Sequence, residues 1–110
     1  MKINADDVGG TLVKDNEIYV VFDNTVLDEL VVSKTILYPE KSTTGHKHAG
    51  QEEVYHFVHG HGMIDVGTVR YDVGAGSIVL IPDGEFHRVH NNSSYENLVF
   101  VCIFNGKREH

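Results

Sequence analysis

Residues 76–91 read GSIVLIPDGEFHRVHN, and this stretch decides the fold. The apolar, β-branched run at 77–81 predicts a buried strand that ends at the Pro82-Asp83-Gly84 turn. A returning strand is predicted at 86–90. Because side chains alternate along a strand, His87 and Val89 share one face of it, and Arg88 and His90 share the other.

The rest of the chain repeats this pattern of short β-branched and aromatic runs separated by Gly, Asn, Asp and Pro. No segment shows sustained helical periodicity. Strands are predicted at 10–14, 17–22, 30–38, 53–58, 62–66, 69–73, 77–81, 86–90 and 97–104. Many short strands at this spacing predict an all-β sandwich or barrel.

Length and composition favour one domain over residues 1–110, with a barrel core at about 30–104 and a polar tail at 105–110. The formal net charge of −7 disfavours binding to nucleic acid or to anionic membranes. No run is long and apolar enough for a membrane span, and residues 1–10 do not resemble a secretory signal. We therefore expect a cytoplasmic protein, without an intramolecular disulfide because the sequence has one cysteine.

Two predicted strands, Leu30 to Leu37 and Leu98 to Phe104, are apolar on both faces. A strand with one face in water would alternate more cleanly between apolar and polar residues. We expect a homodimer in which a second copy covers the outer face; a thick core with a few exposed valines is the alternative.

Six of the eight histidines fall between residues 46 and 87, which indicates metal binding or proton transfer. His46 and His48 project to the same side of an extended segment. On the next strand Glu53 shares a face with Tyr55 and Phe57, the large aromatics expected inside, whereas Glu52 faces outward. Glu53 is therefore the predicted carboxylate ligand.

His87 supplies a fourth predicted ligand from the 76–91 stretch. Three imidazoles and one carboxylate form a site for one divalent transition metal, which could be Fe, Mn, Ni, Zn or Cu. Four protein ligands leave coordination positions for water or substrate, as in a catalytic site. His56, His59 and His61 are expected to be solvated or to face a partner subunit.

The two segments together resemble the paired motifs of the cupin superfamily, here a small single-domain cupin. The first motif, G(x)5HxH(x)3–4E(x)6G, is matched by His46, His48, Glu53 and Gly60, although its leading glycine falls at Glu40. The second, G(x)5PxG(x)2H(x)3N, is matched at Gly76, Pro82, Gly84, His87 and Asn91. The resemblance implies a six-stranded, jelly-roll-like β-barrel, here with extra N-terminal strands, and a metal in its mouth.

The chain is also similar to cupin-type glucose-6-phosphate isomerases, which implies a sugar or sugar-phosphate isomerase. In this interpretation Glu53 either ligates the metal or moves the substrate proton, and Thr44 with Gly45 holds the phosphate. Tyr55 and Tyr38 are further candidates for substrate binding, Tyr55 being equally well explained as a core aromatic.

Two alternatives stay open at this point. An iron-dependent dioxygenase would suit the apolar interior, and a non-enzymatic module that binds a small ligand would use the barrel without catalysis. In each case the expected partner is a small molecule.

Overall fold

Nine β-strands make up the regular structure of residues 1–47 and 49–106, the part of the chain that the computed structural model describes. No helix occurs in this part, and hence none that could cross a membrane. The strands are β1 (Thr11–Asp15), β2 (Tyr19–Asn24), β3 (Leu30–Leu37), β4 (Glu53–His59), β5 (His61–Val66), β6 (Val69–Gly74), β7 (Ile78–Ile81), β8 (His87–His90) and β9 (Leu98–Asn105). All nine strands predicted from the sequence are confirmed.

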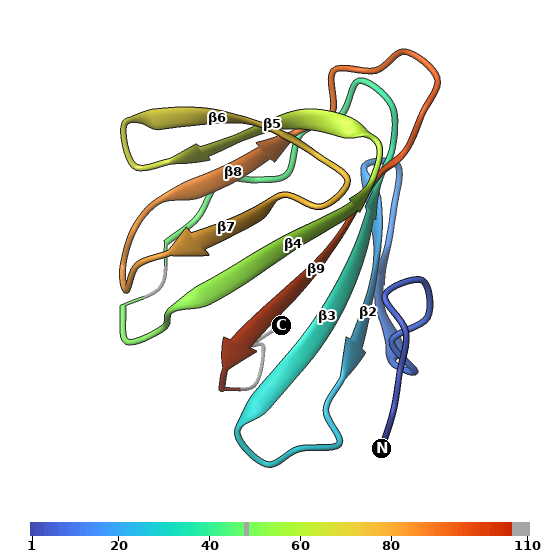
Figure 1. Cartoon of the computed structure of the whole chain (residues 1–110), viewed down its shortest axis with the longest axis vertical. Coiled ribbons are helices and arrows are strands. Elements are labelled where there is room, and N and C mark those ends of the chain that lie inside the picture. Colours follow the sequence, from blue (N-terminus) through green and yellow to red (C-terminus); the bar gives the residue numbers. More distant parts are fainter. Residues whose placement is uncertain (48, 107–110) are drawn as a thin grey trace.

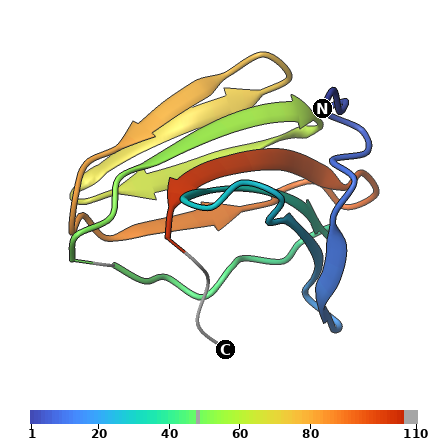
Figure 2. The same ribbon diagram turned by 90° about the horizontal axis from the view of Figure 1, so that it is seen from below.

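Two antiparallel sheets are formed, a six-stranded sheet in the order β1-β2-β3-β9-β4-β7 and a three-stranded sheet in the order β6-β5-β8 (Figure 1). The larger sheet curls strongly, from the green and red strands β4 and β9 over to the blue N-terminal strands (Figure 2). The all-β, jelly-roll-like architecture expected from the sequence is therefore confirmed.

The bounds of β2 differ most from the prediction, since the strand covers 19–24 instead of 17–22. The Asn16 side chain accepts hydrogen bonds from the backbone N–H groups of Ile18 and Tyr19, at 2.9 and 3.0 Å. The N–H groups of these two residues are therefore bonded to the Asn16 side chain, and the hydrogen bonds of the strand begin only after this turn. Asparagine commonly stabilises turns in this way.

The core lies between the sheets and follows the predicted alternation. Val31, Leu37, Phe57, Ile64, Val89 and Leu98 are its most completely buried apolar side chains. On β4 the inward residues Glu53, Tyr55 and Phe57 are buried, and the residues between them are half-buried. The ring of Tyr55 stacks on that of Phe100 with centroids 5.4 Å apart, so aromatic packing fixes the middle of the large sheet.

The position at which the first motif lacks its leading glycine keeps a glycine-like backbone. Glu40 has φ 63°, the one positive φ at a non-glycine residue among those described. This left-handed conformation costs a non-glycine residue about 1 kcal/mol. The loop before the metal-ligand candidates therefore has, at the motif's glycine position, a backbone conformation that glycine adopts most easily.

Candidate metal centre

Three of the four predicted ligands converge at one end of the barrel. One ligand atom from each of His46, Glu53 and His87 lies within 4.8 Å of the other two. Glu53 opens β4 and His87 opens β8, so these two side chains come from the facing sheets. His48, the fourth predicted ligand, lies outside the described residues.

A two-residue bridge holds His46 against His87. The His46 backbone N–H donates to the His87 carbonyl at 3.2 Å, and the His87 N–H donates to the His46 carbonyl at 3.0 Å. The two rings meet edge to face with centroids 4.5 Å apart. Backbone pairing thus brings together two histidines that are 41 positions apart in the sequence.

Both imidazoles are oriented by a carbonyl two residues upstream. His87 Nδ1 lies 3.0 Å from the Glu85 oxygen, and His46 Nδ1 lies 3.2 Å from the Thr44 oxygen. A carbonyl only accepts, so each Nδ1 is the protonated nitrogen and the lone pair sits on Nε2. This is how metal-ligating histidines are commonly held by outer contacts.

The buried pair of Glu53 and His87 fits a metal better than it fits a hydrogen bond. Glu53 Oε2 and His87 Nε2 are 2.7 Å apart, yet neither atom has a hydrogen-bond partner among the described residues. With the proton on Nδ1, two lone pairs face each other, which is costly in a buried site unless a cation or a proton lies between them. A divalent metal that accepts both atoms satisfies them together.

Protonation is the competing way to satisfy this pair in the metal-free protein. Burial of the ring opposes protonation, but the Glu53 carboxylate and the Glu85 carbonyl outweigh it, so the pKa of His87 is raised above its usual value. A proton and a metal therefore compete for the same nitrogen.

A cavity of about 680 Å³ opens beside these residues, a volume typical of small-molecule sites. His46, Glu53 and Tyr55 line it, together with Thr44 from the loop before β4. Tyr38 and Gly45 are not among its lining residues. Gly45 instead lets the Phe86 ring pack against the backbone, where a Cβ atom would clash, so its glycine has a structural explanation.

Sequence reasoning missed the far wall of this cavity. Lys14, Tyr19, Val21, Thr35, Phe100, Cys102 and Phe104 also line it. They come from β1, β2, β3 and β9, which carry no ligand motif. For most of these residues, alternation along the strand predicts the face on which the side chain lies. Which strands lie next to the metal site, however, depends on the order of strands in the sheet.

The other histidines of the described residues do not line the cavity. His59 and His61 are exposed, and His56 is half-buried on the outer face of β4. His90 has a role that the sequence did not reveal. Its ring lies between Asp65 Oδ2 and the Ser42 hydroxyl, each 2.7 Å from one ring nitrogen.

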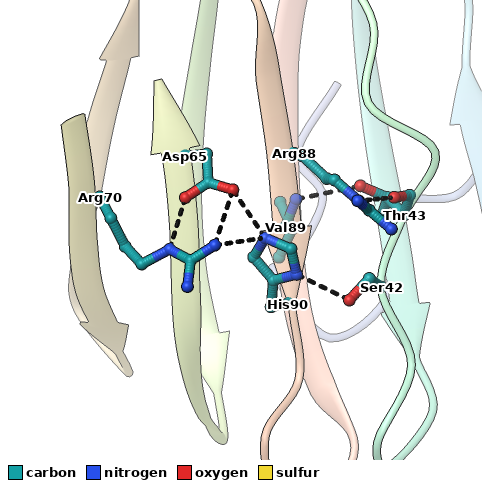
Figure 3. A network of polar contacts seen from close by, with 7 residues as sticks. All are labelled: Ser42, Thr43, Asp65, Arg70, Arg88, Val89 and His90. Carbon is teal, nitrogen blue, oxygen red and sulfur yellow. Dashed lines mark hydrogen bonds and ion pairs between the residues drawn. The ribbon is translucent and has the colours of Figure 1, made fainter. Parts of the chain in front are cut away.

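A polar network across the small sheet holds the loop that carries His46. Figure 3 shows it running from Arg70 on β6 through Asp65 on β5 and His90 on β8 to Ser42. Beside it, the Thr43 hydroxyl accepts from the Val89 N–H at 3.0 Å. The segment before His46 is therefore fixed to β8 by side chains as well as by backbone bonds.

We expect Asp65→Asn to lower the melting temperature at neutral pH by roughly 4–8 °C, as for a loss of about 1 kcal/mol in a partly exposed ion pair. The Arg70 guanidinium, and then the His90 hydrogen bond, hold the pKa of Asp65 well below its usual range. Its stabilising contribution is thus complete above the ordinary Asp pKa near 4 and is lost as the pH falls through the folded-state pKa.

Thermal melts of the Asp65→Asn variant and the wild type between pH 7 and pH 2.5 check this expectation. The gap between the two melting temperatures should narrow below about pH 4. A gap as wide at pH 2.5 as at pH 7 would show that the ionised carboxylate is not what stabilises the network.

Comparisons with known proteins agree with this architecture. The protein MJ1618 of Methanocaldococcus jannaschii, which is uncharacterized, is 22% identical over 78% of this chain and 78% of its own length. The crystal structure of TT1209 from Thermus thermophilus has a TM-score of 0.81 and 20% identity, over 98% of this chain and 100% of that chain. A predicted oxalate decarboxylase from Thermotoga maritima has a TM-score of 0.77 and 18% identity, over 96% and 98% of the two chains.

At these identities the structural matches establish the fold alone. The family is established by a sequence model described as a cupin domain, which matches residues 34–104. That match covers well over half of the chain and contains the three converging residues. The protein therefore belongs to the cupin family.

Proposed function

We propose that this cupin is an enzyme that uses one divalent transition metal, bound by His46, His48, Glu53 and His87, to act on a small organic molecule. One observation carries the proposal. Glu53 Oε2 and His87 Nε2 are buried and 2.7 Å apart with no other hydrogen-bond partner among the described residues, and they lie beside a cavity large enough for a metabolite. A structural core would rarely retain such a pair without a function.

The bound metal would polarise oxygen atoms of the substrate or of a coordinated water. The chain's own residues supply the rest. The carbonyls of Thr44 and Glu85 fix the ring orientation of the two histidines, and Tyr55 lines the cavity. Buried aromatics on β4 and β9 exclude water from the inner side of the site.

Isomerisation of a sugar or sugar phosphate is the first reaction class that we propose. In it, Glu53 ligates the metal or moves a proton between neighbouring carbons, and Thr44 lies on the cavity wall where it can meet the substrate. Dioxygenation with iron is the second class, and the apolar far wall of Val21, Phe100 and Phe104 favours it. A module that only binds its ligand is the non-enzymatic alternative.

Metal analysis of untagged protein purified without chelator tests the proposal, followed by two activity screens. Near-stoichiometric iron with substrate-dependent O₂ consumption would support the dioxygenase. Zinc, nickel or manganese with turnover of sugars or their phosphates would support the isomerase. Protein that holds no metal and takes up none on titration would contradict the proposed function.

We also propose that the protein is a homodimer that buries the outer face of the large sheet. Leu80, Val54, Ile103 and Val32 are register partners across four adjacent strands, and all four are apolar. On β7, Leu80 is 70% exposed and Ile78 is 61% exposed. Such a continuous apolar row on an outer face favours contact with a second copy through the same patch.

Leu80→Asp is expected to convert a dimer to a monomer at micromolar concentration, because it places a charge on the most exposed part of this row. Size-exclusion chromatography with light scattering measures the mass. Val69→Asp, an exposed apolar residue on the small sheet, is the matched control and should stay dimeric. A monomeric wild type would contradict the dimer.

A further inference from the structure

The cavity contains one feature that the metal site does not use, a lysine on its far wall. Lys14 comes from β1, the edge strand of the large sheet, and lines the same cavity as Glu53 and His46. Of the described residues around the cavity, it alone carries an amine or guanidinium group. Its ammonium lies 5.8 Å from the centroid of the Tyr19 ring, which lines the cavity too.

A β-bulge directs this lysine inward. Leu12 pairs with Phe22, whereas Lys14 pairs with Val21, so Val13 is an extra residue in the ladder. Regular alternation would have placed Lys14 on the same outer face as Leu12, which is exposed. The bulge instead moves Lys14 to the face of the buried Val21, and bulges commonly re-aim a side chain in this way.

Register places Lys14 at the end of a row that crosses the concave face of the sheet. The row runs through Lys14, Val21, Thr35, Phe100 and Phe57 on five adjacent strands. Its middle members are a hydroxyl and apolar groups, and the sheet curls toward its blue β1 end (Figure 2). Lys14, Val21, Thr35 and Phe100 of this row all line the cavity. A ligand in the cavity would thus meet a metal at one end, an apolar wall, and an ammonium at the other end.

The cavity lining does not share the net negative charge of the whole protein. The chain has a net charge of −7, yet Glu53 is the one carboxylate among the described lining residues. A divalent metal and Lys14 together outweigh that carboxylate, so the loaded cavity is positive. Lys14 also forms no ion pair with a carboxylate of the described residues, which leaves its ammonium for a ligand.

We propose that the substrate is a small organic anion whose carboxylate or phosphate group binds Lys14 while its other end reaches the metal. Lys14 is then a specificity-determining residue, selecting an anionic ligand over a neutral one of the same length. This inference rests on the proposed metal-dependent function, because the metal anchors the other end of the ligand.

Two pairs of ligands of matched length test the inference on zinc-loaded protein. Pimelate is compared with heptanoate for a terminal carboxylate, and sorbitol 6-phosphate with sorbitol for a phosphate. Dissociation constants are measured by calorimetry, and the backbone amides of Val21 and Thr35 are followed by NMR. In at least one pair, we expect the wild type to bind the ligand with the added anionic group, pimelate or sorbitol 6-phosphate, about tenfold more tightly than its partner. A tenfold difference is the usual scale of one added charge-assisted contact.

Lys14→Met should abolish that preference and leave the affinity for heptanoate and sorbitol unchanged. Lys14→Arg should retain the preference, because it keeps a positive charge. Lys34→Met removes an equal charge from the outer face of the same sheet and is the matched control. A preference for pimelate alone identifies a carboxylate, and one for sorbitol 6-phosphate alone identifies a phosphate. Both support the inference.

Equal affinities within both pairs, or a preference that survives Lys14→Met, would overturn the inference while leaving the metal site intact. Metal analysis of the loaded proteins separates this from failure of the proposed function. If the wild type takes up no zinc, the proposed function fails before any ligand is added, and this inference fails with it.

Discussion

His87→Ala is expected to weaken metal binding by roughly 100-fold or more, because even contacts that only orient a ligand are worth 10–100-fold. His87 supplies the one buried imidazole of the converging cluster, and its Nε2 faces Glu53 Oε2. Without it, the described cluster reduces to His46 and Glu53. Equilibrium dialysis against zinc, followed by mass-spectrometric metal analysis, measures the loss.

His59→Ala is the matched control, since it removes one exposed histidine outside the cluster. It should keep the metal content of the wild type. Glu53→Gln should resemble His87→Ala, because an amide oxygen is a much weaker ligand than a carboxylate for these metals. Stoichiometric zinc retained by His87→Ala would show that the fourth ligand has been misassigned.

Metal affinity of the wild type should also fall as the pH is lowered, and the direction follows from the pKa of His87. Imidazole binds metal only when Nε2 is deprotonated. Because Glu53 and the Glu85 carbonyl raise the pKa of His87, protons begin to compete above the ordinary histidine pKa near 6.5. His59→Ala should show the same pH dependence as the wild type.

Asn91→Ala is expected to destabilise the fold by about 3 kcal/mol and to lower the melting temperature by on the order of 15 °C. The Asn91 side chain is buried, and its amide nitrogen donates to the carbonyls of Leu37, Tyr38 and Glu96 at 3.0, 3.1 and 2.8 Å. Its oxygen accepts from the Ser93 N–H at 3.0 Å. Alanine would remove all four of these hydrogen bonds, of which the one to Leu37 is buried and the other three are partly buried.

Thermal and urea unfolding measure this loss of stability, and two further variants test its cause. Asn91→Asp keeps the shape of the side chain but replaces the donor that faces three carbonyl oxygens by an acceptor. It should therefore lose at least as much stability as Asn91→Ala. Asn92→Ala removes an exposed neighbour and should change stability by less than about 0.5 kcal/mol. Metal content at low temperature should stay near stoichiometric in Asn91→Ala, which separates this structural role from a role as a ligand.

The sequence motifs thus combine positions of two kinds. His46, Glu53 and His87 converge on the candidate metal centre, whereas Asn91 ties the end of β3 to the loop after β8. Gly60 belongs to the second kind, since its φ is 88° and a Cβ atom there would clash with the Asn97 carbonyl. A shared motif therefore does not imply a shared role in chemistry.

Local alternation in the sequence was enough to determine the nine strands and the faces of Glu53, Tyr55, His87 and Val89, because the side-chain period of a strand depends only on neighbouring residues. The tertiary structure alone decided what depends on pairing between distant segments. The bridge from His46 to His87, the three carbonyls around Asn91 and the bulge that turns Lys14 into the cavity all depend on register and sheet order. A bulge reverses the alternation of side chains along a strand, so regular alternation from Leu12 would place Lys14 on the opposite face from the one it occupies.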